Sequence, residues 1–516
     1  MEASCLRQTE LPAVSRLFQD FLYRFDRVER WFQGMGALRF AEERRAGLVA
    51  ALAEQNASCP ALDQLAQPGT CAIVTGQQVG LFSGPSYTIY KALTAARLAK
   101  QYTEQGQAAV PVFWLATEDH DLREVDHAWL FDGSVKPVPA RVNLNGMPES
   151  APVGPLAPSS WPLEILSESL SSFPYGAAVS QLVAEAYQPG QSFGSAFRRL
   201  LERLLAPYGF LFIDPLHPAV RRLAAPVLRE AVLRADQLSA RVLERNRELE
   251  SAGYHAQVHF EPGSSLFFVL EGGQRVALRR NSNGYLTRDG RYSAEELAGR
   301  AEQLSPNALL RPVVQDFLLP TAAYVGGPAE IAYLAQSQVL YEALLGGMPR
   351  IVSRSGFTLL DRHARRLLQR YRLTLPEVFH SQEQLRERMA ASLIDPALET
   401  EFAAAEQELR ARLERLLTVV ERFDPTLGRA LEKSRSKMLY QLSKMRAKVA
   451  REALRRDAAA QSDADYLHQL IYPHGHLQER FYSILPFLAR HGLDLIPQLY
   501  ECVRLECPHH IVLTVD

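Results

Sequence analysis

The feature that most constrains this fold is a short apolar run that ends in a polar loop and leads into a helical segment. Cys71 to Thr75 is such a run, and Tyr87 to Lys100 has helical composition. A second apolar run, Val110 to Ala116, ends in the acidic sequence 117–121. Two strand-loop-helix units in succession favour an α/β fold with a parallel sheet.

The same pattern continues along the chain with interruptions. Phe210 to Asp214 predicts a third buried strand, and a long helical pattern covers residues 219–251. After a break, the pattern resumes with strands predicted over 309–316, 322–327 and 350–353 and a helix predicted over 330–345. The sheet is therefore expected to be assembled from segments that are far apart in the sequence.

Two segments interrupt the α/β pattern and are interpreted as insertions. Residues 136–206 begin with clustered proline and serine, and residues 253–304 contain short alternating runs joined by turns such as Gly272-Gly273. The second insertion is therefore predicted to be β-rich. The core is then discontinuous and consists of residues 1–135, 207–252, 305–382 and 459–516.

Residues 383–458 have a different composition, rich in Ala, Leu, Glu, Lys and Arg. Apolar residues spaced by three and four positions on either side of Pro425 predict two long helices in an antiparallel coiled-coil hairpin. The first arm carries more acidic residues and the second more basic ones. Pairing of these charges between the arms and an electrostatic docking surface for a partner are both consistent with this distribution.

Composition excludes several classes of protein. The chain has 516 residues, which suggests two to four structural units, and its 57 basic and 58 acidic residues give a net charge of −1. Such a balance provides no general field for nucleic acid or an anionic membrane, so we expect neither as a partner. Five cysteines, with no apolar segment long enough to span a bilayer, favour a cytoplasmic location.

The loop after the first predicted strand is a candidate binding site. Its sequence, TGQQVGLFSGPSYTIYK (75–91), leads to a helix N-terminus, where free N–H groups favour an anion such as phosphate or carboxylate. The glycine spacing matches neither the dinucleotide fingerprint nor a P-loop. The candidate binding residues are Gln77, Gln78, Gly80, Gly84, Tyr87 and Lys91.

A row of four ionisable residues, Glu118 to Asp121, follows the second predicted strand. Acidic residues stabilise the first turn of a helix, but four ionisable residues in a row exceed the number that capping needs. Repelling carboxylates can supply a general base or bind a metal such as Mg²⁺, and the spacing decides neither. The candidate catalytic residues are Asp119, His120 and Asp121, with His127 as a binding residue and no residue assigned as a metal ligand.

Two further segments place polar side chains beside predicted strand ends or turns. The sequences RPVVQD (311–316) and AYVGGPAEIAYLAQ (323–336) supply the first set, and YPHGHLQER (472–480) repeats the turn followed by a polar helix. The first set consists of Gln315, Asp316, Gly326, Gly327, Glu330, Tyr333 and Gln336. The second set consists of Gly475, Gln478 and Arg480.

These motifs, together with PVFWLATEDHDLREVDH (111–127), resemble the BshC family of bacillithiol biosynthesis. They occur in order between residues 75 and 480, so the resemblance covers nearly the whole chain. It implies a Rossmann-like core with two connecting-peptide insertions, placed as in class I aminoacyl-tRNA synthetases, and a coiled coil that pairs two subunits. Ser86, Asp126 and His474 depart from the residues usual in the family, and the last two leave the hydrogen bonding of their motifs open.

The resemblance also implies a reaction, in which L-cysteine is joined through its carboxyl group to the amine of glucosaminyl malate in the last step of bacillithiol biosynthesis. The chain would then be a ligase that forms a carbon–nitrogen bond. Because amide formation from a free carboxylate is uphill in water, we expect ATP or another adenine nucleotide to activate the acid, and Mg²⁺ is compatible with that role. The alternative is a nucleotide-binding coiled-coil adaptor or regulatory protein without turnover.

Overall fold

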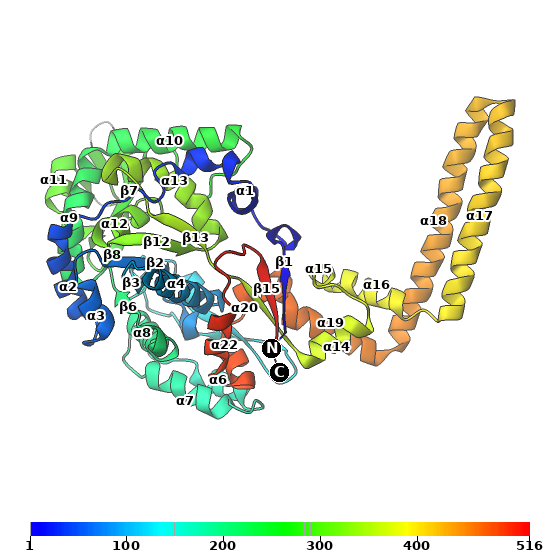
Figure 1. Ribbon diagram of the computed structural model, residues 1–516, viewed down its shortest axis with the longest axis horizontal. Coiled ribbons are helices and arrows are strands. Elements are labelled where there is room, and N and C mark those ends of the chain that lie inside the picture. The colour runs from blue at the N-terminus through cyan, green and yellow to red at the C-terminus, as the bar shows by residue number, and fades with distance from the viewer. Residues whose placement is uncertain (1, 149, 282–283, 289, 516) are drawn as a thin grey trace. The chain divides into compact units, whose positions relative to one another are not determined.

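A computed structural model describes residues 2–148, 150–281, 284–288 and 290–515. The chain divides into two compact units (Figure 1). The first comprises Met1–Gly133, Pro137–Thr358 and Glu479–Leu513, and the second comprises Ser134–Lys136, Leu359–Gln478 and Thr514–Asp516. The finer division into a core, two insertions and a hairpin stays a prediction.

The centre of the first unit is a five-stranded parallel sheet with the order β13-β12-β2-β3-β6. Its strands are β2 (Cys71–Gln77), β3 (Ala109–Leu115), β6 (Leu211–Ile213), β12 (Thr321–Gly326) and β13 (Arg350–Ser353). All seven residues of β3 are buried, as expected for a strand covered on both faces. The parallel α/β sheet predicted from the sequence is confirmed.

Helices of the first unit pack around this sheet, and α4 contacts both β2 and β3. Apolar side chains of the sheet, such as Trp114, share one core with Leu228 and Leu238 of the helices. In chain order the helices are α1 (Arg16–Tyr23), α2 (Arg45–Ala53), α3 (Pro60–Leu65), α4 (Tyr87–Glu104), α5 (Leu122–Val125), α6 (Leu163–Leu170), α7 (Gly176–Ala186), α8 (Phe193–Leu204), α9 (Pro218–Leu233), α10 (Ala235–Ser251), α11 (Ala294–Gly299), α12 (Arg311–Leu318), α13 (Pro328–Leu345), α20 (Gln478–Phe481), α21 (Leu485–His491) and α22 (Leu495–Cys502).

One predicted element was wrong. Residues 309–316, which contain the β-branched pair Val313 and Val314, were predicted as a strand, but α12 is a helix. The Asn307 side chain accepts hydrogen bonds from the N–H groups of Leu309 and Leu310, and this local bonding outweighs the β propensity of the two valines.

The long helical pattern predicted over 219–251 is confirmed, and it consists of two helices. Arg234 leaves the helical region with φ −105° and ψ 14°, so α9 ends at Leu233 and α10 begins at Ala235. Apolar periodicity alone does not reveal a break of one residue.

The second predicted insertion contains an antiparallel sheet with the order β10-β9-β8-β7-β11. Gly272 and Gly273 form the predicted turn with φ values of +57° and +75°, a backbone region that glycine adopts readily. The strands are β7 (Ser264–Glu271), β8 (Gln274–Asn281), β9 (Gly284–Leu286), β10 (Arg291–Tyr292) and β11 (Leu304–Pro306). The remaining strands are β4 (His127–Phe131), paired with β5 (Pro137–Arg141), and β1 (Glu2–Leu6), β14 (Phe357–Asp361) and β15 (His510–Val515) in the order β1-β15-β14.

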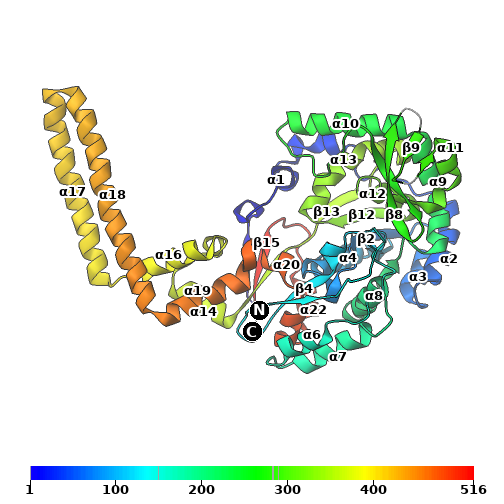
Figure 2. The same ribbon diagram turned by 180° about the vertical axis from the view of Figure 1, so that it is seen from behind.

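The second unit is helical, and its two long helices α17 (Pro396–Phe423) and α18 (Pro425–Arg456) lie side by side (Figures 1 and 2). Asp424 separates them, and its side chain accepts a hydrogen bond from the Thr426 N–H at 2.6 Å. The guanidinium of Arg446 pairs with Glu399 across the hairpin. The predicted coiled-coil hairpin is confirmed. The shorter helices that precede or follow it in the chain are α14 (Arg362–Arg370), α15 (Leu375–Val378), α16 (Gln382–Ser392) and α19 (Ala458–Ile471).

Candidate functional site

A pocket of about 430 Å³ lies within the first unit, at the carboxyl ends of the parallel strands. Gln77 ends β2, Ala116 follows β3, and Gly327 follows β12. This edge is the usual ligand site of open α/β sheets because loops from several strands meet there. The charged side chains of the lining are Lys91, Glu118, Asp119, Glu124, Arg275, Arg311, Glu330, Arg354 and Arg480.

Lys91 and Glu330 form an ion pair in the floor of the pocket. The Lys91 ammonium lies 2.7 Å from Glu330 Oε2 and also donates to Gln77 Oε1 at 3.2 Å and to the Gly76 carbonyl. Burial raises the pKa of Glu330, but Lys91 outweighs this effect and holds it below its ordinary value. Burial lowers the pKa of Lys91, and the Glu330 carboxylate opposes that shift. Both charges therefore have a fixed partner.

Glu330 is oriented by the start of α13. Its Oε2 accepts a hydrogen bond from the Gly327 N–H at 2.8 Å, as in a capping box, and its Oε1 accepts one from the Tyr324 hydroxyl at 2.5 Å. Pro328 fits the first turn of this helix because the turn needs no N–H there. The Gly-Gly-Pro turn thus places the carboxylate opposite Lys91.

One side of the pocket is acidic. Gln78 donates both hydrogens of its amide nitrogen, to Asp119 Oδ2 at 2.5 Å and to Glu124 Oε2. The two carboxylates therefore converge on one nitrogen. Glu118, a further acidic lining residue, is buried and pairs instead with Arg221 of α9. An amine or ammonium of a ligand would find two acceptors near Asp119 and Glu124.

The lining also carries guanidinium groups and tyrosine rings, which we call its basic side. Arg354 and Arg480 lie over the ring of Tyr87, with guanidinium carbons 5.3 Å and 5.8 Å from its centre. Arg311 of α12 donates to the hydroxyl of Tyr333 at 2.9 Å. Arginine is well suited to bind carboxylate or phosphate because its fork donates two parallel hydrogen bonds.

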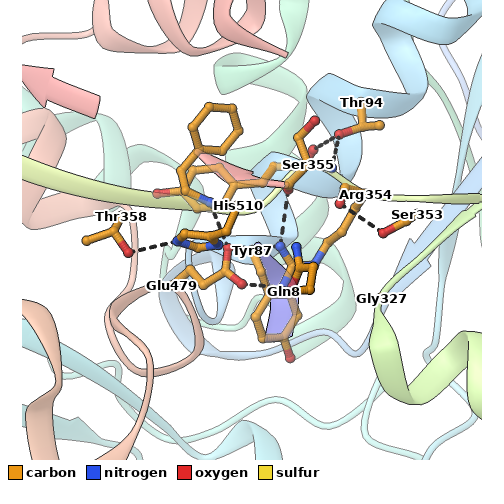
Figure 3. A network of polar contacts seen from close by, with 12 residues as sticks. Gln8, Tyr87, Thr94, Gly327, Ser353, Arg354, Ser355, Thr358, Glu479 and His510 are labelled. Atoms are coloured by element: carbon orange, nitrogen blue, oxygen red, sulfur yellow. Dashed lines mark hydrogen bonds and ion pairs between the residues drawn. The ribbon is translucent and has the colours of Figure 1, made fainter. Parts of the chain in front are cut away.

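Arg354 is held by a buried carboxylate. Its Nη1 and Nη2 donate to the two oxygens of Glu479 at 2.9 Å and 2.5 Å, and the Phe357 N–H donates to the same carboxylate at 3.0 Å (Figure 3). Burial raises the pKa of Glu479, but Arg354 outweighs this and lowers it overall. His510 lies beside this pair with Nε2 2.8 Å from the Thr358 hydroxyl, and burial lowers its pKa to about 4, so the ring is neutral.

The pocket brings together nine of the residues predicted from the sequence. The nine predicted residues in its lining are Gln77, Gln78, Tyr87, Lys91, Asp119, Gly327, Glu330, Tyr333 and Arg480. They come from four separate predicted segments, which the fold brings together at the carboxyl ends of the parallel strands.

Two predicted catalytic residues lie outside this lining. The Asp121 side chain is exposed and accepts from the Arg123 N–H, so it caps α5. His120 Nδ1 lies 3.0 Å from Arg275 Nη1, and burial, followed by the Arg275 charge, lowers its pKa. His127 of β4 pairs with Asp126 at 2.7 Å and is also outside the lining.

The other predicted residues outside the lining have local roles in the fold. A Cβ atom on Gly80 would lie 3.2 Å from Gly84, whose φ is +64°, and one on Gly326 would lie 3.3 Å from the Glu330 side chain. Gln336 bonds to Asn246 and Val258. Gln315 and Asp316 are buried and bond to each other. In the second unit, Gln478 bonds to the backbone of Leu359 and Leu470, and Gly475 has a φ of +79°.

Sequence reasoning missed several lining residues. Arg354 directly follows the strand predicted over 350–353, so its position after a strand end was a usable signal. Arg311 and Glu124 lay in quoted motifs but were not selected. Arg275 lies on β8 and reaches the pocket from the antiparallel sheet, and nothing in the local sequence indicates this. Within the described ranges, no group of three His, Cys, Asp or Glu side chains is arranged to hold a metal ion.

Comparison with known proteins identifies the family. Residues 1–355 match the model of the N-terminal Rossmann-like domain of BshC, described as a bacillithiol biosynthesis protein, and residues 357–515 match its C-terminal coiled-coil domain. The chain belongs to the BshC family. The fold class predicted from the resemblance is therefore confirmed, including the Rossmann-like domain and the coiled coil.

Relatives of full length carry the same family name. The proteins from Solibacter usitatus and Koribacter versatilis are 49% and 35% identical over the whole of both chains, and the one from Salinibacter ruber is 32% identical over 98% of this chain and 97% of its own. Each is named "Putative cysteine ligase BshC". In the part of the chain that the structure describes, no helix is both long and apolar enough to cross a membrane.

Proposed function

We propose that the chain joins the carboxyl group of L-cysteine to the amine of glucosaminyl malate and so forms bacillithiol. The observation that carries the proposal is a pocket lined by both carboxylates and guanidinium groups, in the domain that matches the bacillithiol family. The acceptor carries groups of complementary charge, an amine on its sugar and two carboxylates on its malate. The names of the relatives support a cysteine ligase.

The acidic side of the pocket is suited to the amine. An ammonium must lose a proton before its nitrogen can attack a carbonyl carbon. Asp119 and Glu124 already accept two hydrogen bonds from the single nitrogen of Gln78, so a substrate nitrogen that replaces this amide would meet the same two acceptors. In this mechanism Asp119 holds the amine and takes its proton as a general base.

The basic side is suited to the carboxylates and to activation of cysteine. Arg311, Arg354 and Arg480 supply positive charge for malate or for a phosphate group. Because the amide bond is uphill from a free acid, we include ATP or another adenine nucleotide as the activating substrate, with Mg²⁺ as its usual counterion. Lys91 and Glu330 keep Gln77 and Tyr324 in place beneath these groups.

A deletion strain tests the proposed step in the cell. Loss of the gene should abolish bacillithiol and cause glucosaminyl malate to accumulate, and the wild-type chain should restore the thiol. Normal bacillithiol in the deletion strain would contradict the assignment. Unchanged glucosaminyl malate together with nucleotide binding by the purified protein would instead favour an adaptor without turnover.

We also propose that two copies of the chain pair through the coiled-coil hairpin. Large apolar side chains are exposed near its tip, including Val419 at 64%, Phe423 at 84% and Leu427 at 48%. Exposed apolar residues in such a cluster indicate a contact surface, and a second copy presents a complementary one by symmetry.

Introducing a charge at this tip should separate the subunits. The wild-type chain is expected to sediment at twice its mass of 57.8 kDa, and the double variant Val419→Glu with Phe423→Glu at that mass. Thr418→Glu places the same charge on an exposed polar position beside Val419 and should leave the dimer intact. A wild-type chain that sediments as a monomer at micromolar concentration would contradict this model.

A further inference from the structure

Arg311 differs from Lys91 and Arg354, two other cations of the pocket, in the charge of its hydrogen-bond partners. Lys91 and Arg354 face the carboxylates of Glu330 and Glu479. The Arg311 guanidinium donates instead to the amide oxygen of Gln315 at 3.0 Å and to the hydroxyl of Tyr333 at 2.9 Å. Both acceptors are neutral, since burial raises the pKa of Tyr333, so its hydrogen bonds fix the guanidinium without neutralising it.

A buried carboxylate lies behind Gln315. Asp316 is 3% exposed and accepts hydrogen bonds from Gln315 Nε2 at 2.9 Å, from the Thr321 hydroxyl at 2.8 Å and from the Tyr341 hydroxyl. Burial raises the pKa of Asp316 to about 6, and the three hydrogen bonds oppose this rise. All three of its partners are donors, so the carboxylate acts as an acceptor.

These two neighbours determine how the Gln315 amide is oriented. A guanidinium can only donate, and an ionised carboxylate can only accept. The amide must therefore turn its nitrogen to Asp316 and its oxygen to Arg311, because the reverse orientation would oppose donor to donor and acceptor to acceptor. The same contacts insert a neutral group between two opposite charges.

We propose that Gln315 is a positioning residue that separates Arg311 from Asp316 and keeps the guanidinium charge available in the pocket for a substrate carboxylate. Gln315 and Asp316 then act through Arg311 and do not touch the substrate. The inference deepens the proposed function, since it assigns the carboxylate end of the acceptor to Arg311. A dicarboxylate of the malate type is the ligand class that this site would take.

Two nearly isosteric substitutions separate this role from a purely structural one. Gln315→Glu places a carboxylate directly on the guanidinium, so binding of a dicarboxylate should weaken by about tenfold or more. Asp316→Asn removes a negative charge but leaves an oxygen that accepts from Gln315, so binding should be unchanged or tighter. A purely structural role for the 315–316 pair predicts that both variants weaken binding to a similar extent.

Calorimetry with the full-length protein and L-malate measures these effects, and inorganic phosphate serves as a second probe. We expect the wild type to bind L-malate more tightly than phosphate. Arg311→Gln and Gln315→Glu should weaken the binding of L-malate by about tenfold or more, and Asp316→Asn should bind L-malate at least as tightly as the wild type. Thermal unfolding identifies any variant that does not fold. If Asp316→Asn fails to fold, the Arg311→Gln and Gln315→Glu variants still test the proposal.

Several results would overturn the inference. For the variants, these are equally weakened binding of L-malate in Gln315→Glu and Asp316→Asn, or unchanged binding in Arg311→Gln or Gln315→Glu. For the wild type, they are tighter binding of phosphate than of L-malate, or no binding of L-malate. Bacillithiol formation by the wild-type protein is measured separately. If the wild type forms the product while Arg311→Gln binds L-malate normally, this inference is contradicted and the proposed function is not affected.

Discussion

Replacing Asp119 with Asn should lower turnover by about 100- to 10,000-fold, because the variant cannot take a proton from the attacking amine. Asn is close in size to Asp and can still contact Gln78, so the pocket should keep its shape. Amines with a pKa near 8 lose their proton in solution as the pH rises. The rate of Asp119→Asn should therefore rise more steeply than that of the wild type between about pH 7 and 9.

Asp121→Asn provides the matched control, since it makes the same chemical change two residues away. Asp121 caps α5 and lies outside the pocket lining, so turnover should remain within about twofold of the wild type. Initial rates of both variants over this pH range test the assignment. Equal losses in the two variants, or a normal rate in Asp119→Asn, would exclude Asp119 as the general base.

Glu479→Gln is expected to lower the free energy of unfolding by about 3–5 kcal/mol, because it leaves the buried Arg354 guanidinium without a counter-charge. The two side chains are only 5% and 3% exposed, so water cannot replace the lost carboxylate. Chemical denaturation followed by fluorescence measures the change. The same variant should impair substrate binding, since Arg354 lines the pocket.

Two further variants show whether burial of the charge is the cause. Arg354→Met combined with Glu479→Met removes both charges and should recover at least half of the lost stability. Glu501→Gln breaks the exposed pair with Arg97, whose side chains are 67% and 32% exposed, and should cost no more than about 1 kcal/mol. Similar losses in Glu479→Gln and Glu501→Gln would contradict this explanation.

The edge of the sheet that carries the site could be predicted from the sequence because parallel strands end at the same side. Gln77, Asp119 and Glu330 lie far apart in the chain, yet each lies at the end of a strand or shortly after one. Apolar runs bounded by polar residues locate such strands. Once the strands were assigned, their proximity followed from the topology.

The contacts that assign roles could not be predicted in the same way. Arg275 comes from an antiparallel sheet whose placement against the parallel sheet has no local sequence signal. Asp121 and Asp119 look equivalent in the sequence, but one caps a helix and the other meets Gln78. For 309–316, β-branched residues favoured a strand, and the side chain of Asn307 favoured the helix that forms.

Direct detection of the product tests the central claim, that this pocket forms bacillithiol. Purified protein is mixed with L-cysteine, glucosaminyl malate labelled with ¹⁵N at its amine, and ATP with Mg²⁺, and the mixture is followed by mass spectrometry. We expect a product with the mass of bacillithiol that retains the label in its new amide bond. The wild type and Asp121→Asn should form it at similar rates, and Asp119→Asn at least about 100-fold more slowly. Two results would contradict the account. The first is formation of this product by Asp119→Asn at the wild-type rate. The second is absence of the product with the wild type even when lysate of the deletion strain is added.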